Sequence, residues 1–156
     1  MDALNDAILE VAPDDPGLAP LIERHLKLMW ASSPSCSVHA MDAVALSEAG
    51  ARFFVLYEDK APVAMGALKQ INADHGELKS MHVIEAARGR GLARRILDHL
   101  VQAARSDGLR RLSLETGSQP VFEPARAFYR AEGFSDCPPF EGYELDPNSV
   151  FMTRAL

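Results

Sequence analysis

The chain has 156 residues, which suits one domain over residues 1–156, and its 47% apolar and 24% charged residues are typical of a globular protein. The formal net charge of -6 argues against a nucleic-acid partner, because binding to phosphates needs a basic surface. No apolar run is long enough to span a bilayer and no secretory signal is visible, so we expect a cytoplasmic protein without a membrane partner.

The first half of the sequence predicts short strands and two helices. Asp15 followed by Pro16 is a helix start, a capping aspartate and then a proline in the first turn. Apolar residues with helical spacing continue to position 31. The expected elements are a strand at 7–12, helices at 17–31 and 41–48, and the strands of a hairpin at 53–57 and 63–71.

The second half alternates strands and helices. The clearest helix, 92–105, has one apolar and one polar face and is followed by Gly108. Strands at 78–83 and 111–115 flank this helix, so they form a βαβ unit and should be parallel neighbours. A loop at 84–91, a helix at 123–132 and a strand at 149–153 complete the prediction of a mixed sheet with helices on both faces.

The cysteines give no sign of a structural cross-link or metal site. Cys36 and Cys137 are too few for a disulfide framework and lack the spacing of a zinc site. We therefore expect two free thiols and no bound metal.

Positive charge is concentrated at 88–111, where seven arginines accompany two aspartates. A basic segment in an acidic chain indicates a site for a small anion. The segment begins with RGRGLA, 88–93, which joins a strand to a helix. Backbone N–H groups in the first helical turn have no intrahelical acceptor, and the helix dipole adds positive charge there. Gly89 and Gly91 let the backbone approach a phosphate without a side chain in the way.

Several patterns could explain this hexapeptide, including a plain glycine turn before a helix. A P-loop would end in Gly-Lys-Ser/Thr, which is absent. A dinucleotide fingerprint fits Gly89 and Gly91 but puts Arg94 where a small residue is needed, although Glu115 imitates the acidic ribose ligand of such folds. A third pattern, [Arg/Gln]-x-x-Gly-x-[Gly/Ala], is matched in full.

Three linked motifs carry a family resemblance: ELKSMHV at 77–83, RGRGLA at 88–93 and ARAFYRAEGF at 125–134. In this order they resemble the GNAT superfamily of N-acetyltransferases, and the C-terminal stretch resembles a group of its small bacterial members. The resemblance implies an enzyme that transfers an acetyl group from acetyl-coenzyme A to a primary amine of a small molecule, amino acid or peptide. A non-catalytic module that binds or senses acyl-coenzyme A is the alternative.

The resemblance also implies an α/β fold with a mixed, mostly antiparallel twisted sheet, in which the parallel strands 77–83 and 111–115 splay apart. The pantetheine arm of the coenzyme would lie in the cleft and pair with backbone groups of the first strand, and its pyrophosphate would bind the loop amides. The expected cofactor-binding residues are Met81, His82, Val83, Arg88, Gly89, Arg90, Gly91, Leu92, Ala93 and Tyr129.

Direct acetyl transfer in a ternary complex needs a base for the amine, a donor to the thioester oxygen and a proton for the thiolate. Tyr129 resembles the family's general acid, and a backbone N–H of Met81 or His82 is the expected oxyanion donor. Glu77 resembles the base of histone acetyltransferases, and Glu115 resembles that of ribosomal-protein N-terminal acetyltransferases. We slightly favour Glu115 as the general base, because it lies where the cleft is expected to open. For either glutamate, a solvated charge at the end of a strand is an equally good explanation. His82 is a third candidate for the base.

The acceptor site is less defined by the sequence. Phe122 stands where many relatives carry a cofactor-contacting asparagine, and Ser118 or Gln119 could replace that contact. The acidic net charge suits a cationic amine. A homodimer is expected from the resemblance alone. The candidate acceptor-pocket residues are His39, Phe140, Tyr143 and Ser149.

Overall fold

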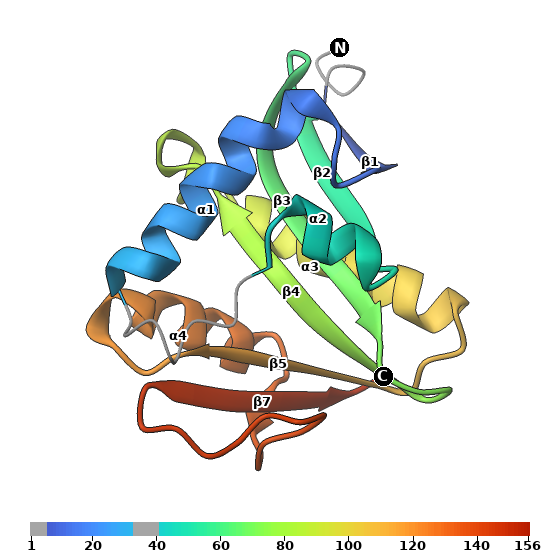
Figure 1. The fold of residues 1–156 in the computed structure, drawn as a ribbon, viewed down its shortest axis with the longest axis vertical. Coiled ribbons are helices and arrows are strands. Elements are labelled where there is room, and N and C mark those ends of the chain that lie inside the picture. The colour runs from blue at the N-terminus through green and yellow to red at the C-terminus, as the bar shows by residue number, and fades with distance from the viewer. Residues whose placement is uncertain (1–5, 33–40) are drawn as a thin grey trace.

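The fold is a seven-stranded sheet covered by helices (Figure 1). The computed structural model describes residues 6–32 and 41–156. The strand order is β1-β2-β3-β4-β5-β7-β6, in which β4 and β5 are parallel and every other neighbouring pair is antiparallel. Within the described residues, no helix has the length and apolar character to cross a membrane.

The bounds of the elements differ from the sequence predictions mainly at their ends. The strands are β1 (Asp6–Val11), β2 (Arg52–Glu58), β3 (Ala61–Gln70), β4 (His75–Val83), β5 (Arg111–Gly117), β6 (Ser135–Asp136) and β7 (Ser149–Ala155). The α-helices are α1 (Ala19–Ser32), α2 (Ala43–Glu48), α3 (Leu92–Ser106) and α4 (Glu123–Ala131). Single 3-10 turns precede three of them, at Pro16–Leu18, Glu85–Ala87 and Pro120–Phe122.

Local side-chain chemistry explains several of these boundaries. The carboxylate of Asp15 accepts a hydrogen bond from the Gly17 N–H at 2.9 Å, which confirms the predicted cap. Asp59 and Lys60 both have positive φ, 49° and 67°, and this turn joins β2 to β3 as a hairpin. The two-residue strand β6 was not predicted, because so short a segment has no readable alternation.

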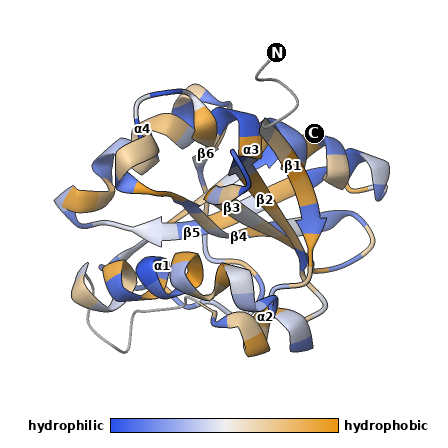
Figure 2. Ribbon diagram, turned by 90° about the horizontal axis from the view of Figure 1, so that it is seen from above, coloured by the Kyte–Doolittle hydropathy of each residue, from blue (hydrophilic) through white to orange (hydrophobic). Residues whose placement is uncertain are grey.

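The sheet separates two hydrophobic clusters (Figure 2). In that view α3 and α4 lie above the sheet, and α1 and α2 lie below it. The larger cluster packs the apolar face of α3, including Ile96, Leu97 and Leu100, against the sheet. The smaller cluster packs Leu21 and Ile22 of α1 against the other face of β2 and β3. The predicted mixed sheet with helices on both faces is therefore confirmed.

The parallel strands part halfway along their length. The last paired residues are Leu78 and Leu114, yet β4 continues to Val83 and β5 to Gly117. Figure 1 shows the two strands diverging from this point. The parting confirms the splayed pair that the family resemblance implied, and it leaves the backbone of β4 unpaired with β5 beyond Leu78.

Candidate functional site

The loop between β4 and α3 has the backbone shape that the glycines predicted. Gly89 and Gly91 have φ of 78° and 76°, and Gly91 is the N-cap of α3. Nothing lies within 4 Å of where a Cβ would stand on either glycine, so both face open space. Arg88 Nε donates to the Val83 carbonyl oxygen at 3.2 Å and so ties the loop to the end of β4. Arg90 forms an ion pair with Glu58 of β2, which balances part of the charge expected at this site.

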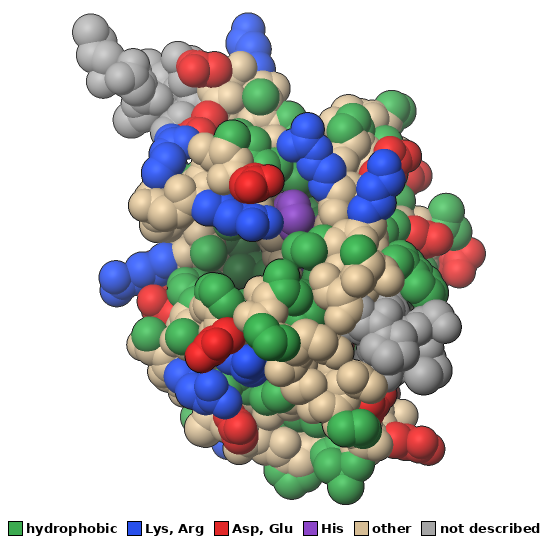
Figure 3. Space-filling model, turned by 90° about the vertical axis from the view of Figure 1, so that its left-hand side faces the viewer, with side chains coloured by type: hydrophobic (Ala, Val, Ile, Leu, Met, Phe, Trp, Pro, Cys, Tyr) green, Lys and Arg blue, Asp and Glu red, His purple; other side chains and the backbone are tan. Residues whose placement is uncertain are grey.

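Two cavities meet beside the part of β4 that is not paired with β5. The sheet cavity, about 390 Å³, extends along β4 and β5 from Glu77. The loop cavity, about 430 Å³, lies over Gly89 and Gly91. On the side toward which the strands diverge, the molecular surface is hollowed, and a histidine shows between basic side chains (Figure 3). The residues that line both cavities are Met81, His82, Val83, Arg88, Pro124, Ala125 and Tyr129.

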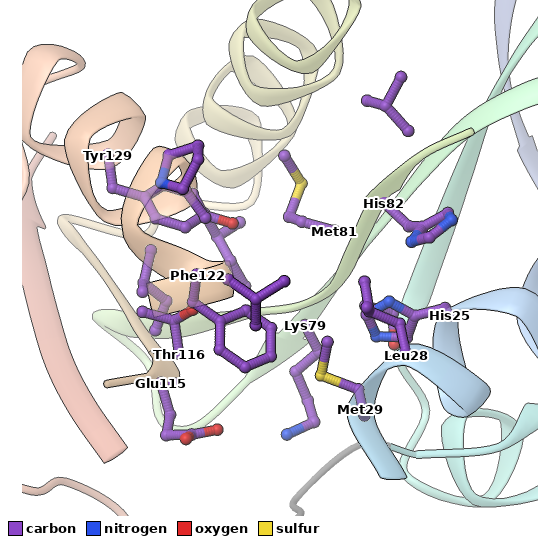
Figure 4. Close-up of a pocket in the computed structure, with 18 of the residues that line it drawn as sticks. His25, Leu28, Met29, Lys79, Met81, His82, Glu115, Thr116, Phe122 and Tyr129 are labelled. Atoms are coloured by element: carbon purple, nitrogen blue, oxygen red, sulfur yellow. The ribbon is translucent and has the colours of Figure 1, made fainter. Parts of the chain in front are cut away.

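Tyr129 lies at the junction of the two cavities. It is 7% exposed, and its ring packs edge-on against Phe134 with 5.7 Å between centroids. Burial raises the pKa of the Tyr129 phenol far above its usual range, so the hydroxyl stays protonated at neutral pH. Figure 4 shows the ring reaching from α4 toward Met81 of β4.

A hydrogen-bonded charge cluster occupies the end of the sheet cavity where β4 and β5 are still paired. The Tyr143 hydroxyl donates to Glu77 Oε2 at 2.6 Å, and Lys79 Nζ donates to the same oxygen at 3.2 Å. Lys79 Nζ also lies 3.0 Å from the Tyr143 hydroxyl oxygen. Glu77 is only 2% exposed, so these bonds stabilise a carboxylate that has lost most of its hydration. Burial, and next the negative charge of Glu77, raise the pKa of Tyr143, which therefore remains a donor.

Glu115 lies one residue beyond the last parallel pair, on the diverging part of β5. It is half-buried and lines the sheet cavity. Figure 4 shows its carboxylate at the same end of the cavity as the Lys79 ammonium group. The two predicted carboxylates therefore differ in burial: Glu77 is buried with two donors on one oxygen, and Glu115 is half-buried.

Phe122 narrows the cavity on the β5 side. Its ring is buried and packs on Gly117, where a Cβ would come within 2.2 Å of Phe122 Cδ2. Ser118 and Gln119, considered as polar substitutes at this place, instead bond to the loop before β7. The Ser118 hydroxyl donates to the Pro147 carbonyl oxygen, and the Gln119 amide donates to Asn148 Oδ1.

Two histidines form the opposite wall. The rings of His25 on α1 and His82 on β4 meet edge-on at 5.3 Å. Burial lowers the pKa of His25 to about 3 and that of His82 to about 4, with smaller effects from His82 on His25 and from Arg88 and Arg24 on His82. Both rings are neutral at pH 7, and His25 Nδ1 has no hydrogen-bond partner among the described residues.

The predicted acceptor residues are only partly brought together. Tyr143 lines the sheet cavity, and Phe140 packs beside it with 5.2 Å between ring centroids without lining the cavity. Ser149 is paired with Gly117 across β5 and β7 and does not line the cavity. His39, like Cys36, lies outside the described residues, and Cys137 is a free thiol. No group of metal-ligating side chains occurs among the residues described.

The sequence analysis missed Lys79 and the α1 wall. Lys79 shares the face of β4 with Glu77, since the two are separated by one residue of a strand, and this alternation could have identified it. Leu28 and Met29 belong to the apolar pattern of α1, which predicts a helix but not which of its residues face a cavity.

The parted parallel strands beside a glycine-bounded helix start define an α/β protein with a cleft between two strands of its sheet. Comparison with known proteins identifies the family to which the chain belongs. The model of the acetyltransferase (GNAT) family matches residues 19–134, and the chain belongs to this family, whose members transfer an acetyl group from acetyl-coenzyme A.

Individual relatives agree with this membership. An uncharacterized N-acetyltransferase of Bacillus subtilis, YsnE, is 42% identical over 136 residues, which cover 87% of this chain and 90% of the relative. An IAA acetyltransferase of Azospirillum brasilense is 35% identical over 97% of this chain and 99% of its own length. Among solved structures, an acyl-CoA N-acyltransferase of Klebsiella pneumoniae has a TM-score of 0.79 and 25% identity, with 97% of each chain covered.

Proposed function

We propose that the chain transfers the acetyl group of acetyl-coenzyme A directly to a primary amine that is bound in the same cleft. One observation carries the proposal: the cavity over the glycine loop and the cavity between the parted strands share Tyr129 and residues 81–83 of β4, which are not paired with β5. An acyl donor in the first and an acceptor in the second would meet at these residues. The amine could then attack the thioester carbonyl directly, and no acetylated enzyme intermediate would be needed.

The loop cavity is the proposed site of the coenzyme. Gly89 and Gly91 leave the amides at the start of α3 open to a pyrophosphate, and Arg88 stands beside them. The pantetheine arm would add to the unpaired edge of β4 at 81–83, as an extended peptide adds to a sheet. A backbone N–H of Met81 or His82 would then donate to the thioester oxygen as it becomes negative.

Tyr129 is the proposed general acid. A phenol with a raised pKa keeps its proton until a strong base forms nearby, and the departing thiolate is such a base. Tyr129 lies where the two cavities meet, so its hydroxyl could donate a proton to the coenzyme sulfur without blocking the amine.

Glu115 is the proposed general base, acting directly or through one water. Glu77 Oε2 already accepts hydrogen bonds from Tyr143 and Lys79, so Glu77 is better suited to holding this end of the cavity than to taking a proton. Glu115 is half-buried, lines the sheet cavity and lies on the part of β5 that diverges from β4, where an amine could be bound.

The test is release of free coenzyme A thiol from acetyl-coenzyme A in the presence of a panel of amines. IAA is tested beside the amine panel as a separate acceptor, because the Azospirillum brasilense relative is named for it. On the best acceptor, Tyr129→Phe and Glu115→Gln should each lower kcat by about 100-fold or more, the usual size of an acid–base contribution. Glu77→Gln should lower kcat less than Glu115→Gln does.

Matched controls lie outside both cavities. Tyr57→Phe on β2 and Glu123→Gln at the start of α4 should leave kcat within about twofold of the unmodified protein. Full activity in both Tyr129→Phe and Glu115→Gln would disprove the assigned roles. Tight coenzyme binding by calorimetry with no transfer to any amine would instead favour the non-catalytic acyl-coenzyme A-binding module.

A further inference from the structure

Lys79 is a buried cation inside the sheet cavity. Its side chain is only 10% exposed, and it lines this cavity beside Glu77. Figure 4 shows it pointing away from Met81, toward the end of the cavity where the Glu115 carboxylate also lies. Lys79 belongs to the same strand as Met81 and His82, the proposed oxyanion donors, so β4 determines how far the ammonium group lies from the reacting centre.

Two hydrogen bonds orient the Lys79 ammonium group. Nζ donates to Glu77 Oε2 at 3.2 Å and to the Tyr143 hydroxyl oxygen at 3.0 Å. The Tyr143 hydroxyl donates its own proton to Glu77, so it acts only as an acceptor toward Lys79. An ammonium group has three N–H donors, and within 6–32 and 41–156 no further acceptor bonds to Nζ. The third N–H is therefore left for a group that enters the cavity.

Aromatic packing keeps this donor in place. The Tyr143 ring centroid lies 5.7 Å from Lys79 Nζ, and the ring packs against Phe140 and Phe151 with centroid separations of 5.2 Å and 5.5 Å. Phe140 and Phe151 do not line the sheet cavity, so they support Tyr143 from behind. A donor that is fixed before a ligand binds loses little conformational freedom when it forms a hydrogen bond.

The ion pair with Glu77 determines which kind of oxygen suits the third N–H. Glu77 is 2% exposed and already provides the carboxylate that the Lys79 cation needs. A second carboxylate on the same ammonium group would come close to Glu77, and like charges repel strongly where water is excluded. A neutral oxygen, of a hydroxyl or an amide carbonyl, would gain a charge-assisted hydrogen bond without this repulsion.

Building on the proposed function, we infer that Lys79 binds a neutral oxygen of the acceptor, which is thus an amine with a hydroxyl or amide carbonyl at its far end. The nitrogen would lie beside Met81 and His82, and the oxygen beside Lys79 Nζ. Glu77 and Met81 are separated by about 13 Å of extended strand, so the nitrogen and the oxygen are closer together than this. Lys79 selects the acceptor and takes no part in proton transfer.

The experiment compares ω-amino alcohols of increasing length with n-alkylamines in which a methyl group replaces the hydroxyl. The two members of each pair have the same number of non-hydrogen atoms. With acetyl-coenzyme A at saturation, kcat/KM for the alcohol should exceed that for the alkylamine by at least about tenfold at one chain length and by less at the others, because only one length brings the oxygen to Nζ. An ω-amino amide of that length shows whether a carbonyl oxygen binds better than a hydroxyl. The ω-amino acid should be a poorer acceptor than the alcohol.

Equal use of alcohols, amides and alkylamines at every length would overturn the inference and leave acetyl transfer in place. Transfer to none of these amines, or to any other amine, would instead contradict the proposed function itself.

Variants at the ion pair test Lys79 directly. Glu77→Gln should keep the preference for the alcohol over the alkylamine and should improve the ω-amino acid relative to the alcohol, because the Lys79 charge loses its partner. Adding Lys79→Met to this variant removes the donor without leaving a buried carboxylate unpaired, and the alcohol and alkylamine should then be used about equally. A preference for the alcohol that survives in the double variant would disprove the role of Lys79.

Lys69→Met is the matched control for the loss of a lysine. Lys69 lies opposite Glu77 on β3 but lines neither cavity, so this variant should keep the unmodified ratio of alcohol to alkylamine. The same loss of preference in Lys69→Met would show that a change in overall charge, and not a hydrogen bond from Lys79, sets the ratio.

Discussion

Replacing His25 with leucine should remove much of the acid sensitivity of the fold. His25 is buried at 6% exposure, and its pKa of about 3 in the folded chain lies below the value of about 6.5 expected when unfolded. The unfolded chain therefore binds one more proton at this site between pH 6.5 and 3. The neutral His25 therefore contributes its full share of the free energy of unfolding above pH 6.5, and this share is lost as the pH falls from 6.5 toward 3.

The size of this effect follows from the two pKa values. At pH 5 the His25 side chain is almost fully protonated in the unfolded chain and neutral in the folded one. This difference lowers the free energy of unfolding by about 2 kcal/mol relative to pH 7.5. His82 changes stability in the same direction, but by less, because it is only partly buried. The His25→Leu variant keeps the His82 contribution. At pH 7.5 it should be at least as stable as the unmodified protein, since it also removes an unpartnered buried nitrogen.

Urea unfolding at pH 7.5 and pH 5.0 measures this difference. The loss of unfolding free energy between the two pH values should be about 2 kcal/mol smaller in His25→Leu than in the unmodified protein. Ile22→Val, a buried change on the same helix without a titratable group, should lower stability by about 1 kcal/mol at both pH values. An unchanged pH dependence in His25→Leu would refute the placement of a neutral histidine in this wall.

Two further substitutions test the packing and polar contacts of the cleft. Gly117→Ala should destabilise the fold by about 1–3 kcal/mol in urea unfolding, because its Cβ would overlap Phe122; combined with Phe122→Val it should cost less than the sum of the single changes, and strict additivity would contradict the contact. Tyr143→Phe should cost about 1–3 kcal/mol by the same measurement, since the buried Glu77 carboxylate loses one of its two donors; a loss no larger than that of Tyr57→Phe would argue against this hydrogen bond.

The sequence predicted the parts of the fold and site that depend on short, local patterns. The amphipathic face of α3 and the glycines of 88–93 determine both the helix and the open amides at its start. The order of strand, helix and strand predicted that β4 and β5 would be parallel neighbours. Cofactor, acid and base residues came from the family motifs, and their roles stay predictions, as does the homodimer.

Contacts between distant segments could not be predicted in the same way. Tyr143 meets Glu77 across 66 positions, and only the packing of the C-terminal loop brings the phenol to the carboxylate. Arg90 was expected at the mouth of the anion site, but its ion pair with Glu58 depends on how the β2–β3 hairpin lies against the loop. Spacing along one strand or helix contains no information about such partners.

The parting of the strands itself has a local cause that links the two cavities. Lys79 of β4 pairs with Ala67 of β3, and His82 pairs with Met65. Between these pairs β4 has two residues, Ser80 and Met81, opposite the single residue Gly66 of β3. The extra residue makes a β-bulge, in which Ser80 has a φ of 57°. A bulge bends its strand, and this one follows directly after the last pairing with β5. It also turns the Met81 sulfur over Gly66, where a Cβ would come within 2.8 Å of it. The bulge therefore opens the sheet cavity and, by the same extra residue, sets the backbone of 81–83 facing the loop cavity.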